Sequence, residues 1–304
     1  MRVGMVILPQ RRWPEQAPMW RRADEAGFDH LWTYDHLTWD PLAGTAWGAT
    51  VPTLVAAAAV TSRAPLGTWV ASPNYRHPVP FARELAALDD VSGGRAIAAV
   101  GAGTSGHDAR VLGDPPLAPA DRAARLEEFV HLLDGVLTSA TTDHDGRFYT
   151  ARDARTTLPC VQSPRLPLVV AANGVRTMRL AARAGDGWAT TGSTPRTATD
   201  EQWWAGVAVL AERFTEVLAQ VSAAGERAAA AAPRRYLSLD AAPTFSMVSV
   251  AHLTECVARA AELGFTDVVT HWPVPGAPVY DAPEEMVDAV AEVLVDLQSG
   301  PGAG

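Results

Sequence analysis

Short apolar runs alternate with longer amphipathic segments along most of this chain. The apolar runs have the length and composition of buried parallel strands, and they lie at 2–8, 30–34, 66–71, 96–100, 168–172, 187–190, 235–239 and 266–271. Helical patterns separate them, at 14–26, 51–62, 79–91, 120–137, 174–184, 200–223, 251–263 and 283–297. Because eight strands alternating with eight helices make a closed α/β barrel, the pattern predicts a (β/α)8 TIM barrel and favours it over an open doubly wound sheet.

One segment interrupts this alternation. Residues 138–167 are rich in turn formers, with an Asp145-Gly146 pair and three prolines. An Asp-Gly pair is a strong signal for a tight hairpin. We therefore expect an insertion after the fourth helix that carries one small hairpin. Residues 1–299 should form a single barrel domain, and the glycine-rich end at 300–304 should be a disordered tail.

The composition is that of a globular protein with a large core. Hydrophobic residues make up 48% of the chain and charged residues 19%. The net charge of −9 argues against nucleic acid or an anionic membrane as a partner. The chain has no apolar stretch of membrane-spanning length, its first residues do not read as a signal peptide, and we expect a cytoplasmic protein. Cys160 and Cys256 stand far apart and outside any metal-type spacing, so neither a disulfide nor a metal site is expected.

All 25 basic residues are arginine, and the sequence contains no lysine. Schiff-base catalysis, pyridoxal-phosphate anchoring and a P-loop lysine all require the missing amine. Any bound phosphate must therefore be held by arginine, by backbone amides or by a helix N-terminus.

The strongest candidate for chemistry is the Asp35-His36 pair, which comes where the second apolar run ends. A βα barrel places its catalytic groups at the carboxyl ends of its strands. An imidazole there can give or take a proton near neutral pH. The alternative, a helix cap beside a loop histidine, loses weight because Trp39 and Trp47 follow closely.

Three further strand ends carry polar or aromatic residues. Trp69 lies within the third strand and Tyr75 follows it, and a tryptophan there either supports a flat ring or packs the barrel. The turn GAGTSGHD at 101–108 could let a ligand approach the backbone closely, or could serve chain geometry alone. Asn173-Gly174 ends the fifth strand and opens a helix, a position suited to a phosphate.

Four segments together resemble the bacterial luciferase-like superfamily of flavin and deazaflavin oxidoreductases, which are (β/α)8 barrels. They are GFDHLWTYDHL at 27–37, YRHPVPFARELAALDDVSGGR at 75–95, GAG at 101–103 and AANGVRTMRLAARAGDGW at 171–188. The resemblance implies a flavin or deazaflavin ring in the barrel mouth. It also implies a bulge with a non-proline cis peptide in the third strand, near Trp69-Val70.

The resemblance also implies roles for single residues. Asp35 would contact the deazaflavin, and His36 would act as acid or base near its reactive carbon. The remaining cofactor contacts would come from Trp69, Val70, Ala102, Gly103, Thr104, His107, Asn173, Gly174 and Val175, with Asn173 and Gly174 at the phosphate. Apart from the resemblance, the number of aromatic rings near these strand ends predicts that Trp39, Trp47 and Tyr75 shape an apolar pocket for a hydrophobic organic substrate.

The Asp-His pair and the sequence AARAGDGW look most like the branch that uses coenzyme F420 for hydride transfer. The sugar-phosphate dehydrogenases of that branch have a glutamate where this chain has Thr104, and they hold the substrate phosphate with lysines, which argues against glucose 6-phosphate here. A monooxygenase that uses reduced FMN and oxygen is the alternative, and a non-catalytic flavin-binding barrel is a third reading. No segment resembles a nicotinamide-binding domain, so an external reductase would supply reduced cofactor. Similar proteins are often homodimers, and we expect one here.

Overall fold

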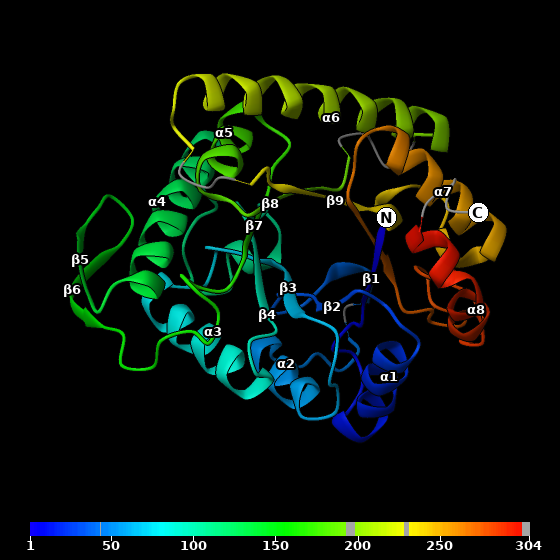
Figure 1. Cartoon of the computed structure of the whole chain (residues 1–304). Coiled ribbons are helices and arrows are strands. Elements are labelled where there is room, and N and C mark those ends of the chain that lie inside the picture. The colour runs from blue at the N-terminus through cyan, green and yellow to red at the C-terminus, as the bar shows by residue number, and fades with distance from the viewer. Residues whose placement is uncertain (43, 193–197, 228–230, 300–304) are drawn as a thin grey trace.

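Eight parallel strands close into a barrel at the centre of the molecule (Figure 1), and the structure, a computed structural model, describes residues 1–42, 44–192, 198–227 and 231–299. Around the barrel the strands run in the order β1-β10-β9-β8-β7-β4-β3-β2. Their bounds are β1 (Arg2–Val6), β2 (His30–Thr33), β3 (Leu66–Ala71), β4 (Ala96–Gly101), β7 (Leu168–Ala171), β8 (Gly187–Thr190), β9 (Arg234–Ser238) and β10 (Asp267–His271). The predicted (β/α)8 fold is confirmed.

A ring of helices covers the outside of the barrel (Figure 1). They are α1 (Trp13–Glu25), α2 (Thr50–Ala58), α3 (Pro78–Ser92), α4 (Pro119–Thr138), α5 (Val175–Ala184), α6 (Asp200–Ala223), α7 (Val250–Glu262) and α8 (Met286–Ser299). Helix α2 ends four residues before the predicted Ser62, because the buried carboxylate of Asp24 accepts hydrogen bonds from the backbone N–H groups of Ser62 and Ala64. Those N–H groups therefore do not continue the α2 helix, and the segment leads into β3 instead.

The insertion after α4 contains the expected hairpin. Its strands β5 (Thr141–Asp145) and β6 (Thr150–Arg155) pair antiparallel and project beyond α4 in Figure 1. Glu128 on α4 fixes the turn, because its carboxylate accepts hydrogen bonds from the backbone N–H groups of Arg147, Phe148 and Tyr149. The predicted tail at 300–304 lies outside the described residues.

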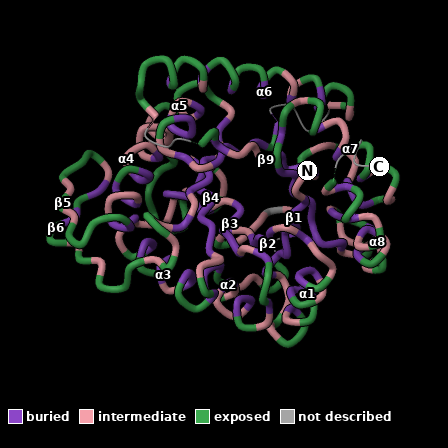
Figure 2. Tube along the Cα trace, viewed as in Figure 1, coloured by how far each residue is buried: buried purple, intermediate pink, exposed green. Residues whose placement is uncertain are grey.

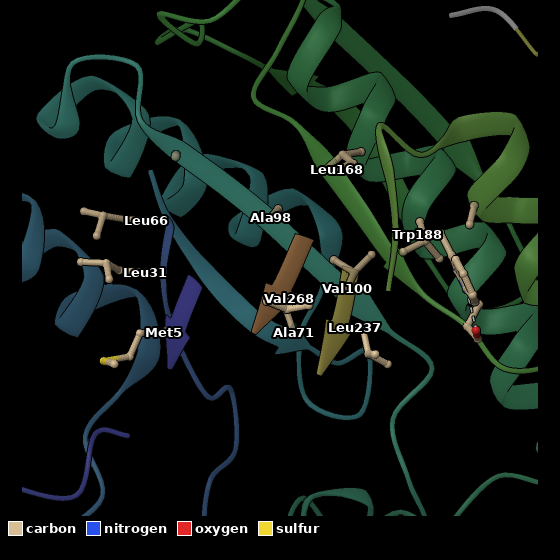
Figure 3. Close-up of a cluster of buried hydrophobic side chains, with 14 of the residues drawn as sticks. Met5, Leu31, Leu66, Ala71, Ala98, Val100, Leu168, Trp188, Leu237 and Val268 are labelled. Carbon is tan, nitrogen blue, oxygen red and sulfur yellow. Dashed lines mark hydrogen bonds between the residues drawn. The ribbon is translucent and has the colours of Figure 1, made fainter. Parts of the chain in front are cut away.

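The core has two layers, because successive side chains of a strand point to opposite faces. An outer layer lies between strands and helices; it includes Met5, Leu31, Leu66 and Trp188 (Figure 3). An inner layer fills the barrel itself and includes Val6, Trp32, Trp69, Tyr236 and Val269. Burial is accordingly concentrated at the centre of the tube drawing in Figure 2, and exposure on its rim.

Large and small residues are matched inside the barrel. A Cβ atom at Gly67 would overlap the indole of Trp32, and one at Gly187 would lie 2.8 Å from the ring of Tyr236. These glycines leave the space that the two aromatic rings occupy. The barrel is therefore packed below its mouth, and the predicted site residues lie at the carboxyl end of the strands.

None of the described helices is both long and apolar enough to cross a membrane. Cys160 and Cys256 are both free thiols. Across the described ranges, no group of three or more His, Cys, Asp or Glu side chains is arranged to hold a metal ion.

Candidate active site

His36 stands at the carboxyl end of β2 and is held by an aspartate from another loop. Its Nδ1 lies 2.6 Å from Oδ2 of Asp108, while Oδ1 of the same carboxylate accepts the backbone N–H of Leu37 at 2.9 Å. The His36 side chain is 30% exposed and that of Asp108 is 8% exposed. Since a carboxylate accepts, Nδ1 of His36 carries the hydrogen of this bond. Within the described part of the chain Nε2 has no hydrogen-bond partner, so it is the nitrogen that can exchange a proton at the mouth.

Asp108 is a site residue that the sequence analysis did not identify. It lies in η2 (His107–Ala109), in the glycine-rich turn that was assigned to the mouth. Burial raises the pKa of Asp108, but hydrogen bonds from His36 and Leu37 outweigh burial and lower it below its usual range. Asp108 is therefore ionised at neutral pH and orients the imidazole. Its exposed neighbour His107 makes no such contact among the described residues.

Asp35 is fully buried and has an arginine as its partner. The Arg76 guanidinium binds it in a bidentate manner, with Nε to Oδ2 at 2.6 Å and Nη2 to Oδ1 at 2.7 Å. Arg76 also reaches Oε2 of Glu84 at 3.0 Å. Burial and then the Asp35 charge raise the pKa of the Tyr75 hydroxyl, which lies against this ion pair. The structure thus places Asp35 behind the mouth, where it joins the loops after β2 and β3.

Aromatic rings line one side of the mouth. The Trp47 indole N–H donates to the carbonyl oxygen of His36 at 2.7 Å, and the ring centroids of Trp39 and Trp47 lie 6.5 Å apart. Trp39 also stacks on Tyr280 at 5.9 Å and meets Tyr34 edge-on at 5.2 Å. Two of the three predicted pocket residues, Trp39 and Trp47, therefore lie together beside His36, while Tyr75 lies on the Asp35 side.

A second histidine was also missed, although it ends a predicted strand. His271 is the last residue of β10, and its Nδ1 lies 2.8 Å from Oδ2 of Asp240 while its Nε2 lies 2.8 Å from the Tyr34 hydroxyl. The position at a strand's carboxyl end was a usable signal for His271. Nothing in the sequence marks Asp240 as its partner, because the two are 31 positions apart.

Strand β3 is irregular at the place that the resemblance indicated. Its register against β4 shifts between Thr68 and Ala71, and the Trp69-Val70 peptide bond is cis. The Trp69 side chain is 5% exposed and packs 4.9 Å from the ring of Trp32 in the inner layer. Val70 lies next to the position that a Cβ atom of Gly101 would occupy. The predicted bulge and cis bond are confirmed.

The glycine turn after β4 is attached to the loop after β3. Gly103 has a φ of +72°, and a Cβ atom there would overlap Ser72 and lie 2.7 Å from Nδ2 of Asn74. Asn74 Nδ2 donates to the carbonyl oxygen of Thr104 at 3.1 Å. Ala102 is half-buried and Thr104 is exposed, so these residues form one wall of the mouth.

The N-terminus of α5 fits a phosphate group. Its N-cap, Gly174, makes no capping hydrogen bond through a side chain, and the first turn, which begins at Val175, contains no acidic residue. A Cβ atom at Gly174 would meet nothing closer than 3.9 Å. The side chain of Asn173 is held by Thr190 and by the carbonyl oxygen of Gly192. Free backbone N–H groups at an open helix start attract anions, so this end suits a phosphate without any lysine.

Comparison with known proteins agrees with this architecture. The fold and the polar mouth define a TIM-barrel protein with its site at the carboxyl ends of the strands. The family model described as luciferase-like monooxygenase matches residues 1–242, and the chain belongs to this luciferase-like family.

Curated relatives match the chain over part of their length. The F420-dependent glucose-6-phosphate dehydrogenase of Beutenbergia cavernae is 39% identical over 176 residues, which are 57% of this chain and 51% of that protein. The enzyme of the same name from Nakamurella multipartita is 36% identical over 186 residues, 59% of this chain and 52% of that protein. The chain thus spans about half the length of the curated relatives it matches.

Solved structures share the fold at low sequence identity. An F420-dependent secondary alcohol dehydrogenase in complex with an F420-acetone adduct superposes with a TM-score of 0.76 at 16% identity, covering 97% of this chain and 98% of that one. A monooxygenase from Streptomyces bottropensis gives 0.70 at 20% identity, covering 97% and 98%.

Proposed function

We propose that this protein is an oxidoreductase that uses coenzyme F420 for hydride transfer to an activated double bond or carbonyl of a small organic substrate. The observation that carries the proposal is the His36–Asp108 pair, held at the mouth after β2, the strand that pairs with the irregular β3. The names of the relatives from Beutenbergia cavernae and Nakamurella multipartita support the choice of coenzyme.

The residues at the mouth suit a bound deazaflavin. Reduced coenzyme F420 would supply the hydride. The open start of α5 at Gly174 would hold its phosphate, the turn at Ala102 to Thr104 would flank the ring and its side chain, and Trp69 with Val70 would support the ring from below.

The chain's own part in the reaction is proton movement and placement. Asp108 fixes the His36 ring through Nδ1, so that Nε2 can transfer the proton that accompanies the hydride. Asp35 and Arg76 hold the two loops that frame the mouth. Trp39, Trp47 and Tyr75 would exclude water and favour an apolar substrate. An external reductase would supply the reduced cofactor, and we propose a homodimer as the working form.

Titration of the purified protein with coenzyme F420 and with FMN, followed by ring fluorescence, tests this proposal. We expect F420 to bind and FMN to bind much more weakly. A preference for FMN would overturn the proposal and favour the monooxygenase alternative, which should consume oxygen in step with substrate.

A pair of variants at Gly174 tests where the phosphate binds. Its φ of −96° and the open space around it accommodate any side chain. Gly174→Asp and Gly174→Asn add caps of the same shape that differ in one negative charge. A phosphate at this helix end should make F420 bind about tenfold more weakly to the Asp variant than to the Asn variant. Equal affinities would place the phosphate elsewhere.

A further inference from the structure

A continuous chain of hydrogen bonds runs from the interior to the aromatic side of the mouth. Asp240 contacts His271, His271 contacts the Tyr34 hydroxyl at 2.8 Å, and Tyr34 contacts the Tyr280 hydroxyl at 2.9 Å. The His271 and Asp240 side chains are each 1% exposed. The chain joins the loop after β2, the end of β10 and η3 (Leu239–Ala241), which follows β9.

The hydrogen bonds around Asp240 fix the direction of this chain. Its carboxylate accepts from the backbone N–H of Ser246 at 2.9 Å, from the Thr270 hydroxyl at 3.1 Å and from Nδ1 of His271 at 2.8 Å. Nδ1 of His271 therefore carries a hydrogen. In the neutral ring Nε2 then accepts from Tyr34, and Tyr34 accepts in turn from Tyr280.

This chain of hydrogen bonds can exist in two states that differ by one proton. When His271 is protonated, Nε2 donates to Tyr34, Tyr34 donates to Tyr280, and Tyr280 donates outward. The reversal is possible because a hydroxyl both donates and accepts. Burial raises the pKa of Tyr34, so this phenol passes a proton on rather than persisting as an anion.

The outer end of the chain lies among the residues predicted to bind substrate. Tyr280 stacks on His271 at 4.0 Å and on Trp39 at 5.9 Å, and Tyr34 meets the His36 ring edge-on at 5.7 Å. Tyr280 also has a φ of +59°. A bulky residue is rarely held in this left-handed region, and residues held in this way concentrate at functional sites.

We propose that Asp240, His271, Tyr34 and Tyr280 form a proton relay that serves the substrate side of the mouth. This rests on the proposed hydride transfer. In the direction of reduction, the substrate carbon receives the hydride and the substrate oxygen receives a proton from Tyr280. Tyr280 is reprotonated by Tyr34, and Tyr34 by His271, which becomes neutral. Tyr280 is the catalytic residue of the relay, and Tyr34, His271 and Asp240 act through it, whereas His36 would take up the separate proton that reduced F420 loses together with its hydride.

Nitrogen-15 NMR of histidine-labelled protein tests the relay without any cofactor. We expect the His271 signals, assigned by their loss in His271→Gln, to show a hydrogen on Nδ1, as in the Nδ1–H tautomer that the contact with Asp240 requires. In Asp240→Asn the carboxylate is lost, and the fraction of this tautomer should fall. A wild-type His271 with its hydrogen on Nε2 alone would overturn the proposal.

Kinetics of variants that each lack one tyrosine hydroxyl test whether the relay is used in the reaction. Reduced F420 is the hydride donor, and 2-cyclohexen-1-one and acetone are the probe acceptors. We expect Tyr34→Phe and Tyr280→Phe each to lower kcat by about 10- to 100-fold with little change in KM, and to change the solvent deuterium isotope effect on kcat. Tyr280 lies in the loop between β10 and α8, so Tyr280→Phe gives a result even if the Tyr34 variant fails to fold.

Matched controls come from the hairpin side of the molecule. Tyr149→Phe removes a buried hydroxyl that has no hydrogen-bond partner among the described residues, and His144→Gln changes a histidine that pairs with Glu128 at 3.1 Å. Both should match wild type in kcat and in isotope effect. Wild-type kinetics in both relay variants would overturn the relay and leave the proposed function standing. A wild-type protein that oxidises reduced F420 with neither probe would overturn the proposed function, and the relay with it, even if NMR finds the expected tautomer.

Discussion

Strand β2 carries an Asp-His pair at each end, and the two pairs serve different purposes. Asp29-His30 begins the strand at the amino end of the barrel, and Asp35-His36 follows it at the carboxyl end. His30 is fully buried, whereas the His36 side chain is 30% exposed. The same dipeptide, six positions apart, thus contributes to a cluster of ion pairs at the amino end of the barrel and to the site at its carboxyl end.

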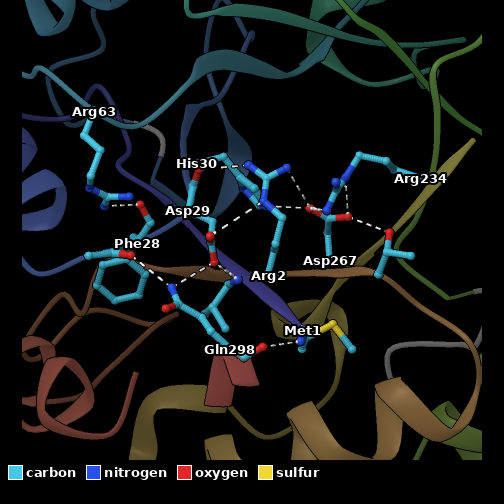
Figure 4. Close-up of polar contacts among 12 residues, drawn as sticks. Met1, Arg2, Phe28, Asp29, His30, Arg63, Arg234, Asp267 and Gln298 are labelled. Carbon is cyan, nitrogen blue, oxygen red and sulfur yellow. Dashed lines mark hydrogen bonds and ion pairs between the residues drawn. The ribbon is translucent and has the colours of Figure 1, made fainter. Parts of the chain in front are cut away.

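At the amino end of the barrel, polar side chains surround Asp267 and pair with its carboxylate (Figure 4). We call this cluster of Asp267, Arg2, Arg234 and His30 the floor. The Asp267 side chain is fully buried, and Arg234 binds it through two nitrogens at 2.9 and 3.0 Å. His30 Nε2 contacts the same carboxylate at 3.1 Å, and Arg2 lies 3.8 Å away. The indole N–H of Trp32 donates to the other ring nitrogen of His30 at 2.6 Å.

The partners explain the difference between the two histidines. An indole N–H can only donate, so protonation of His30 would bring two donors face to face. Burial lowers the pKa of His30, and the opposing effect of Asp267 does not restore it. Within the described ranges only one ring nitrogen of His36 is engaged, and the other is available to exchange a proton. What a histidine does in this barrel therefore depends on the partners of both ring nitrogens.

Removal of Asp267 should have the largest effect. In Asp267→Ala the charges of Arg2 and Arg234 lose their buried partner, and the free energy of unfolding should fall by about 3–5 kcal/mol. Urea denaturation followed by circular dichroism measures it. Asp288→Asn, which breaks an exposed pair with Arg22, is the control and should leave stability unchanged. A small loss in Asp267→Ala would mean that the floor is not what holds the barrel end together.

Removal of His36 should lower the activity and leave the stability of the fold largely unchanged. His36→Ala should lower kcat by about a hundredfold or more, because it removes the group that transfers the proton. F420 affinity should persist, which separates an enzyme from a barrel that only stores cofactor. The oxidation of reduced F420, followed by absorbance, measures kcat. If activity survives in His36→Ala, the proton is transferred by another group.

The barrel fold and the two site residues Asp35 and His36 could be predicted from the sequence. The residues that pair with them, Arg76 and Asp108, could not. Strand and helix periods are local, and a strand's carboxyl end is a local position that marks Asp35 and His36. Asp108 lies 72 positions from His36, and Arg76 lies 41 from Asp35. Those pairings depend on which loops the closed barrel brings together. The periodicity also did not show that His30 is buried and His36 partly exposed, because the burial of each histidine depends on how the closed barrel packs around it.

Loss of the Asp108 charge should have an intermediate effect. Asp108→Asn keeps the shape but weakens the hold on Nδ1 of His36, so kcat should fall by about 10- to 100-fold. Because the pKa of Asp108 is lowered, its contribution to stability is present above its ordinary pKa near 4 and is lost as pH falls through its lower value in the folded protein. The wild-type and variant stabilities should therefore converge below about pH 4. An unchanged kcat would show that Asp108 does not orient His36.

His30 should give the smallest effect, visible only as a pH dependence. Because the folded pKa of His30 lies below the ordinary value near 6.5, the unfolded chain takes up a proton that the folded protein does not, and stability falls as the pH drops below 6.5. From pH 7.5 to 5.5 the wild type should lose up to about 1.4 kcal/mol through this group. His30→Gln cannot titrate, and should lack this component.

Urea denaturation of both proteins at the two pH values measures the difference. The stability gap between wild type and His30→Gln should narrow as pH falls, even if the substitution itself costs stability at pH 7.5. Equal pH slopes for wild type and His30→Gln would mean that the floor accommodates a charged His30, and the distinction between the two ends of β2 would then not rest on the partners of the ring nitrogens.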